Sequence, residues 1–143
     1  ALNRMLACLK PGGWLVLEEP DFSASRGITG SAEQLAAVGK VNHAIKVMYD
    51  KLGMDYALGQ KLEALLLARG LQSVTMGKDG PSSPGGSDMA TIMKMSTVQL
   101  REKYLATGVV TNEDLDRYCR FAENQESSAV YYATIAVTGR KAS

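Results

Sequence analysis

A proline and two glycines separate a helical pattern from the most apolar short run of the chain. Pro11 is followed by Gly12 and Gly13, and the run from Trp14 to Leu17 comes next. Proline fixes φ and ends a helix, and glycine reaches positive φ without steric cost, so the chain can reverse tightly here. The run has no polar alternation, which is typical of a strand covered on both faces by helices. The stretch therefore predicts a helix, a turn and a buried strand of a parallel, layered sheet.

Composition limits the classes of partner. A chain of 143 residues is long enough for one domain, and its formal charge of +1 favours neither nucleic acid nor an anionic membrane as a partner. Cys8 and Cys119 lie far apart without metal-type spacing, so we expect free thiols and a cytoplasmic location. No apolar stretch approaches the ~20 residues that span a bilayer, so we expect no membrane segment.

The first half of the chain alternates between helical and extended patterns. Ser31 followed by Gln34 is typical of a capping box, and Gly53 suits the end of the helix that Ser31 begins. We expect a helix at 2–10, a strand at 14–18, a loop at 23–30, a helix at 31–52, a helix at about 57–69 and a strand at 71–76.

The second half begins with a segment rich in glycine, proline and serine. We expect a loop at 77–87, a helix at 88–107 that breaks near Ser96 and Thr97, a helix that begins at Thr111, a loop at 124–128 and a strand at 131–138. The methionines near 89–95 suit either core packing or the lining of a substrate pocket. The whole chain therefore predicts an α/β fold of about three strands and five helices.

The turn and its surroundings resemble a known family. The segment Leu9-Lys10-Pro11-Gly12-Gly13, followed by an apolar strand and acids, is similar to the turn before the fifth strand of class I methyltransferases that use S-adenosylmethionine. The pair Gly70-Leu71 and the closing segment Val137-Thr138-Gly139-Arg140-Lys141 extend this resemblance over residues 1–143. It implies a partial Rossmann-like sheet, the fifth to seventh strands of the family, with helical insertions at 23–53 and 77–123 on the acceptor side.

The chain departs from the family where the cofactor binds. The family's glycine-rich loop after the first strand and its acid after the second have no counterpart here. The nearest imitation, residues 74–80, lacks the third glycine and opens no helix. The chain therefore resembles the C-terminal half of such an enzyme. S-adenosylmethionine would bind the parent protein only, and the fragment alone would be inactive.

The resemblance also predicts an open sheet edge. The strand at 14–18 would pair with the closing strand on one side, whereas its other neighbour, the family's fourth strand, would be missing. An unpaired apolar strand invites pairing with another chain. We therefore expect a homodimer, or pairing with the missing half, through residues 14–18.

Three acids follow the apolar strand, at the sheet edge where α/β proteins bind ligands. Glu19 is a candidate general base, and Glu18 and Asp21 are candidate acceptor-binding residues. Solvation or capping is the simpler role, and we favour it for at least two of the three.

Other candidates lie on the expected insertions. Phe22, Tyr49 and Tyr104 could line an apolar pocket for a small-molecule acceptor, or serve only as core aromatics. His43 is a candidate base because histidine titrates near neutral pH. It shares a polar helix face with Lys40, so simple exposure to water is the alternative.

Two further classes of function fit the same pattern. The chain could be a noncatalytic α/β dimerisation module, or part of a nicotinamide-dependent oxidoreductase, because a fold alone does not decide function. No serine or cysteine nucleophile stands near the single histidine, and no metal or P-loop motif occurs. The sequence therefore favours methyl transfer from S-adenosylmethionine, with these two alternatives open.

Overall fold

The computed structural model describes residues 1–143 and divides the chain into two units. One unit comprises Ala1–Asp21, Ala57–Asp79 and Thr134–Ser143, and the other comprises Phe22–Tyr56 and Gly80–Ala133. The chain forms six α-helices and six strands, and the strands make two three-stranded sheets. The expected α/β class is confirmed, but three of the six strands were not expected.

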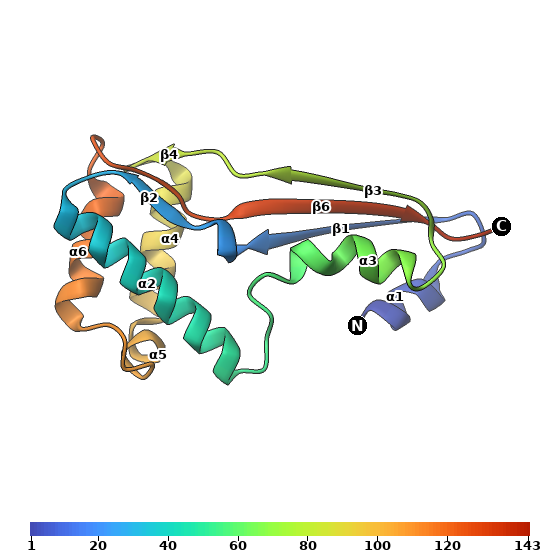
Figure 1. Ribbon diagram of the computed structural model, residues 1–143, viewed down its shortest axis with the longest axis horizontal. Coiled ribbons are helices and arrows are strands. Elements are labelled where there is room, and N and C mark those ends of the chain that lie inside the picture. The colour runs from blue at the N-terminus through green and yellow to red at the C-terminus, as the bar shows by residue number, and fades with distance from the viewer. The chain divides into compact units, whose positions relative to one another are not determined.

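The first unit contains the sheet that the apolar run predicts. Its strands are β1 (Trp14–Asp21), β6 (Ala133–Arg140) and β3 (Gln72–Asp79), in the order β1-β6-β3. Figure 1 shows β6 between the other two and running against both. The register of β3 and β6 places Thr75 opposite Thr138, and their hydroxyl oxygens are 2.7 Å apart. The sheet is therefore antiparallel, and the expected parallel arrangement is wrong.

Helices cover one face of this sheet within the unit. They are α1 (Leu2–Cys8), the 3-10 helix η2 (Leu58–Lys61) and α3 (Leu62–Leu67). Their apolar side chains pack with Leu15 and Leu17 of β1. The buried residues of this cluster are Leu62, Leu66, Leu71, Ile135 and Val137.

The other face of β1 is open. Trp14 is 54% exposed and Val16 is 62% exposed, whereas Leu15 and Leu17 between them are partly buried. The expectation that β1 is covered on both faces is therefore wrong in this unit. Trp14 and Val16 are apolar although they lie on the open face, so the run shows no polar alternation. The absence of alternation therefore does not mean here that both faces of the strand are covered.

The turn before β1 has the predicted geometry. Gly12 has a φ of +74°, and the Gly13 amide donates a hydrogen bond to the Lys10 carbonyl over 2.9 Å. The Gly12 amide also donates to the Lys141 carbonyl, so the turn is tied to the end of β6. The prediction that glycine reverses the chain at this point is confirmed.

The second unit packs four helices with a small sheet. The helices are α2 (Ala32–Lys51), α4 (Asp88–Gln99), α5 (Arg101–Leu105) and α6 (Asn112–Glu123). The strands are β2 (Arg26–Thr29), β5 (Ser128–Val130) and β4 (Ser83–Pro84), in the order β2-β5-β4. β2 and β4 lie in segments expected to be loops, whereas β5 begins at the last residue of the loop expected at 124–128 and continues beyond it. They are two to four residues long and pair with distant partners, so their sequences carry no strand pattern.

The helix boundaries largely follow the predicted signals. The Ser31 hydroxyl accepts a hydrogen bond from the Gln34 amide over 3.2 Å, and the Gln34 side chain accepts one from the Ser31 amide over 2.9 Å. This capping box is confirmed, and Thr111 forms a second one with Asp114. The helix expected at 88–107 is interrupted at Leu100, between α4 and α5, instead of near Ser96.

None of these helices is both long enough and apolar enough to cross a membrane.

Candidate functional site

A small pocket opens among the helices of the second unit. Its volume is about 210 Å³, and it lies between the 3-10 helix η1 (Phe22–Ala24) and helices α2, α4 and α5. Ile45, Met93 and Tyr104 are the buried members of its lining. The full lining is Phe22, Ile45, Met48, Tyr49, Met93, Ser96, Leu100 and Tyr104.

Helical periodicity places these side chains on the pocket. Ile45, Met48 and Tyr49 are three and four residues apart on α2, so they share one face of that helix. Met93 and Ser96 stand in the same relation on α4. The pocket therefore forms where the inner faces of two helices meet the residues that follow α4.

Aromatic rings build one side of the pocket. The Phe22 ring lies 5.8 Å from the Tyr49 ring and 5.6 Å from the Tyr132 ring, measured between centroids, and both pairs are tilted by about 60°. Tilted pairs at this separation are favourable because ring edges and faces carry opposite partial charge. The Phe22 amide also donates a hydrogen bond to the Tyr56 carbonyl. Phe22 is therefore held in place by both its ring and its backbone.

The electrostatics of the pocket favour neutral groups. Its lining contains no acidic or basic side chain. Burial, followed by the nearby Tyr49, raises the pKa of Tyr104 to about 12. The Tyr104 hydroxyl therefore stays protonated at neutral pH and can donate a hydrogen bond.

Three of the candidate site residues meet at this pocket. Phe22, Tyr49 and Tyr104 come from segments far apart in the chain, and all three line it. Five lining residues were not singled out from sequence, although the methionine-rich segment around 89–95 was recognised as suited to a substrate pocket. The helical stripe of α2 was the other available signal, but a stripe does not distinguish core residues from pocket residues.

The acids at the end of β1 lie in the first unit. Asp21 is fully buried, and its Oδ2 atom accepts hydrogen bonds from Gln60 Nε2 over 3.0 Å and from Lys78 Nζ over 3.1 Å. Glu19 is half-buried, and its Cβ lies close to Gly59. Asp21 is therefore engaged by side chains of its own unit.

Glu18 borders a shallow depression on the open face of the first sheet. The depression has a volume of about 440 Å³, and its other lining residues come from β3 and β6. Lys78 and Asp79 add one positive and one negative group to it. Of the three acids, Glu18 is the one that reaches a surface where a ligand could sit.

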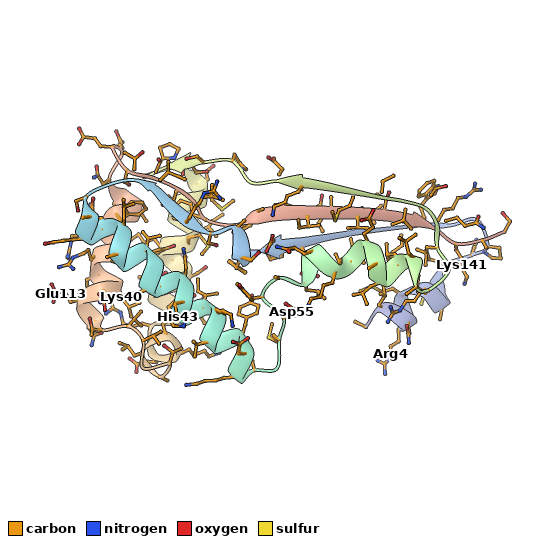
Figure 2. The ribbon with its side chains drawn as sticks, in the orientation of Figure 1. Arg4, Lys40, His43, Asp55, Glu113 and Lys141 are labelled. Carbon is orange, nitrogen blue, oxygen red and sulfur yellow. The ribbon has the colours of Figure 1, made fainter.

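His43 is exposed on α2, on which Figure 2 labels it. It does not line the apolar pocket. The two candidate bases, His43 and Glu19, belong to different units. Each remains a prediction.

The segment that most resembles a glycine-rich cofactor loop, residues 74–80, does not open a helix. Residues 74–79 lie inside β3, and Gly80 leads to the short strand β4. No group of three or more His, Cys, Asp or Glu side chains could hold a metal ion, and both cysteines are free thiols. The second unit provides a small apolar pocket, and the first unit provides an antiparallel sheet.

Comparison with models of known protein families gave no match to this chain. A search among curated proteins likewise gave no significant match.

Proposed function

We propose that this chain is the C-terminal part of a class I methyltransferase and forms the acceptor side of that enzyme. The parent protein would transfer the methyl group of S-adenosylmethionine to a small molecule. The 143 residues would supply the fifth to seventh strands of the parent enzyme's sheet and the pocket that receives the acceptor. The fragment by itself would be inactive.

The order of the first sheet is the observation that carries this proposal. The resemblance required the strand after the Pro-Gly-Gly turn to pair with the closing strand on one side and to have an open edge on the other. β1 has β6 as its single neighbour, and β3 lies beyond β6. The pairing of β1 with β6 alone is what the resemblance requires, so it supports the assignment.

The pocket of the second unit supports the same proposal independently. Phe22, Tyr49 and Tyr104 were candidates for an acceptor pocket, and they line one pocket of about 210 Å³. Methyl transfer needs the acceptor atom aligned with the methyl group more than it needs an elaborate catalyst, and such alignment is worth ~7–11 kcal/mol. Holding and orienting the acceptor would be the contribution of this chain.

Proton transfer is a secondary requirement in this proposal. A general base is needed only when the acceptor atom arrives protonated. Glu19 and His43 remain the candidates for that base, and Glu18 and Asp21 for acceptor binding. In this proposal the cofactor would be held by the parent protein, and the residues of this chain would hold the acceptor and take up its proton.

Calorimetry with S-adenosylmethionine tests the proposal. The titration is performed on this 143-residue chain and on a longer parent chain that includes the residues upstream. We expect saturable binding by the longer chain and none by the shorter one. Binding by neither chain would reject the methyltransferase assignment.

A noncatalytic dimerisation module is the second candidate, and one observation favours it. β1 has a free edge, and its open face carries the exposed Trp14 and Val16. Such a strand is suited to pairing with another copy of the chain. Failure of both chains to bind S-adenosylmethionine, together with stable dimer formation, would support this candidate.

A further inference from the structure

The lining of the pocket in the second unit restricts what can bind there. Eight residues surround it, and none is charged at neutral pH. An ionised ligand would lose its hydration without gaining a counter-charge, and this costs several kcal/mol or more. The ligand must therefore be uncharged.

The size of the pocket limits the ligand to a small molecule. An engineered protein cavity of about 150 Å³ lined by Leu, Ile and Phe binds benzene. The present pocket has about 210 Å³, which is larger by the space of a few heavy atoms. One ring with one or two small substituents fits this volume.

The chemistry of the lining favours an aromatic ring. Phe22 and Tyr49 already make a tilted ring pair, so they offer both an edge and a face to a third ring. Met48 and Met93 bring two thioether groups, which make favourable contacts with aromatic rings and adapt to their outline. A flat π-system gains from all four side chains, whereas an alkyl ring gains only from its buried area.

The polar groups of the lining are few. Ser96 contributes a hydroxyl from α4, and Tyr104 contributes a phenolic hydroxyl, which is protonated at neutral pH. Both can donate to or accept from a neutral substituent. A hydroxyl group on the ligand would therefore find a partner at the pocket.

We propose that this pocket binds a small uncharged molecule built on one aromatic ring that carries a hydroxyl group, as a simple phenol does. The inference rests on the proposed function in one respect only, namely that this phenol would be the methyl acceptor. The pocket lies wholly within the second unit, so the binding itself needs no cofactor.

The experiment uses the 143-residue chain labelled with ¹³C at its methionine methyl groups. 4-Methylphenol is the probe, and it is titrated to about 10 mM, where a weak fragment-sized ligand is still detected. We expect the methyl resonances of Met48 and Met93 to shift along one saturating curve. Met5 and Met76 belong to the other unit and should not move.

Two further probes test the chemical class. 4-Methylbenzoate keeps the methyl-substituted ring but carries a charged carboxylate in place of the hydroxyl group, and we expect it to bind about tenfold more weakly or not at all. 4-Methylcyclohexanol keeps the hydroxyl group but lacks the aromatic ring, and we expect clearly weaker binding. If either probe gave the same dissociation constant as 4-methylphenol, taken from the saturation curve, the proposed ligand class would be overturned.

A matched pair of variants tests the location. Ser96→Phe fills the pocket and should abolish the shifts, whereas Ser82→Phe adds the same ring at an exposed position and should leave them unchanged. If Ser96→Phe does not fold, the wild-type titration still decides the matter. Absence of any shift at Met48 and Met93 would overturn the proposal.

The outcome is separable from that of the proposed function. If this chain binds 4-methylphenol saturably but the longer parent chain does not bind S-adenosylmethionine, the proposed ligand of the pocket is supported and methyl transfer is rejected. If the parent chain binds S-adenosylmethionine but this pocket does not bind 4-methylphenol, only the proposed phenolic ligand is rejected.

Discussion

Individual buried charges are held by partners within their own unit. Asp21 follows the acids at the end of β1, which made it a candidate for ligand binding. Its carboxylate is fully buried and is bonded to Lys78 and Gln60. Lys78, by contrast, has a side chain that is 48% exposed. If the ion pair is broken, the Lys78 side chain can be hydrated by water, whereas the Asp21 carboxylate stays buried.

Replacing Lys78 with methionine should destabilise the protein. The Asp21 carboxylate would stay buried and would lose its ion pair with Lys78, which costs about 1–3 kcal/mol. Urea unfolding of Lys78→Met and of wild type measures the difference. Lys46→Met is the control, because Lys46 and Asp50 form an ion pair whose two side chains are both largely exposed, and we expect little change there. Equal effects of the two substitutions would contradict the assigned role of Asp21.

Asp114 is a second charged residue with a structural role. It completes the capping box of α6 with Thr111, and Lys40 Nζ lies 2.8 Å from its Oδ1 atom. The hydrogen bond from Lys40, followed by the one from the Thr111 backbone, lowers the pKa of Asp114 below its usual 3.8. A lowered pKa in the folded state means that ionised Asp114 stabilises the fold.

The stability contributed by Asp114 should depend on pH. It is fully present well above pH 3.8 and is lost as the pH falls through the lowered pKa. We expect Asp114→Asn to cost about 1 kcal/mol at neutral pH and nearly nothing in strong acid. Urea unfolding at several pH values measures this. Glu113→Gln, which removes an exposed acid from the same turn, should show a much weaker pH dependence, and an identical one would contradict the prediction.

At the scale of elements, β1 combines a covered face with an open one. Leu15 and Leu17 pack onto the cluster formed with α3, whereas Trp14 and Val16 remain exposed. The strand also lacks a neighbour on one edge. An edge strand with exposed apolar side chains is expected to pair where no charge or proline interrupts it. The charges and the proline of β1 stand only at 18–21, so the run from Trp14 to Leu17 is uninterrupted.

The isolated chain should therefore associate through β1. Sedimentation velocity over a range of concentrations should show a dimer for the wild-type chain and a monomer for Val16→Lys, because a lysine on an edge strand opposes pairing. Leu67→Lys is the control, since Leu67 is 56% exposed on α3 and is not part of the sheet. A monomeric wild-type chain at every concentration would contradict pairing between copies.

At the scale of the whole molecule, two segments that are far apart in sequence make up one unit. Helical insertions were expected at 23–53 and 77–123, and the second unit comprises 22–56 and 80–133. Within it, β2 pairs with β5 across about a hundred residues. The pocket depends on this assembly, because α2 comes from the first segment and α4 and α5 come from the second.

Local sequence signals were sufficient to predict the elements whose ends are set by proline, glycine or a capping residue. Proline and glycine placed the turn before β1, and the capping box placed the start of α2, because these residues act on their immediate backbone. The short strands β2, β4 and β5 escaped prediction. Their backbone hydrogen bonds are made with distant segments, so their own residues carry no local signal that predicts a strand.

Signals in the amino-acid sequence were enough to locate the turn before β1 and the first residues of α2 and α6, and they made Phe22, Tyr49 and Tyr104 candidates for one pocket. The antiparallel sheet, the open face of β1 and the pocket that these three aromatics share depend on the folded chain. The difference lies in how far apart in the chain the interacting residues are. A turn or a cap is a contact between near neighbours in the chain, whereas a sheet order or a pocket is made by residues that meet only after the chain has folded.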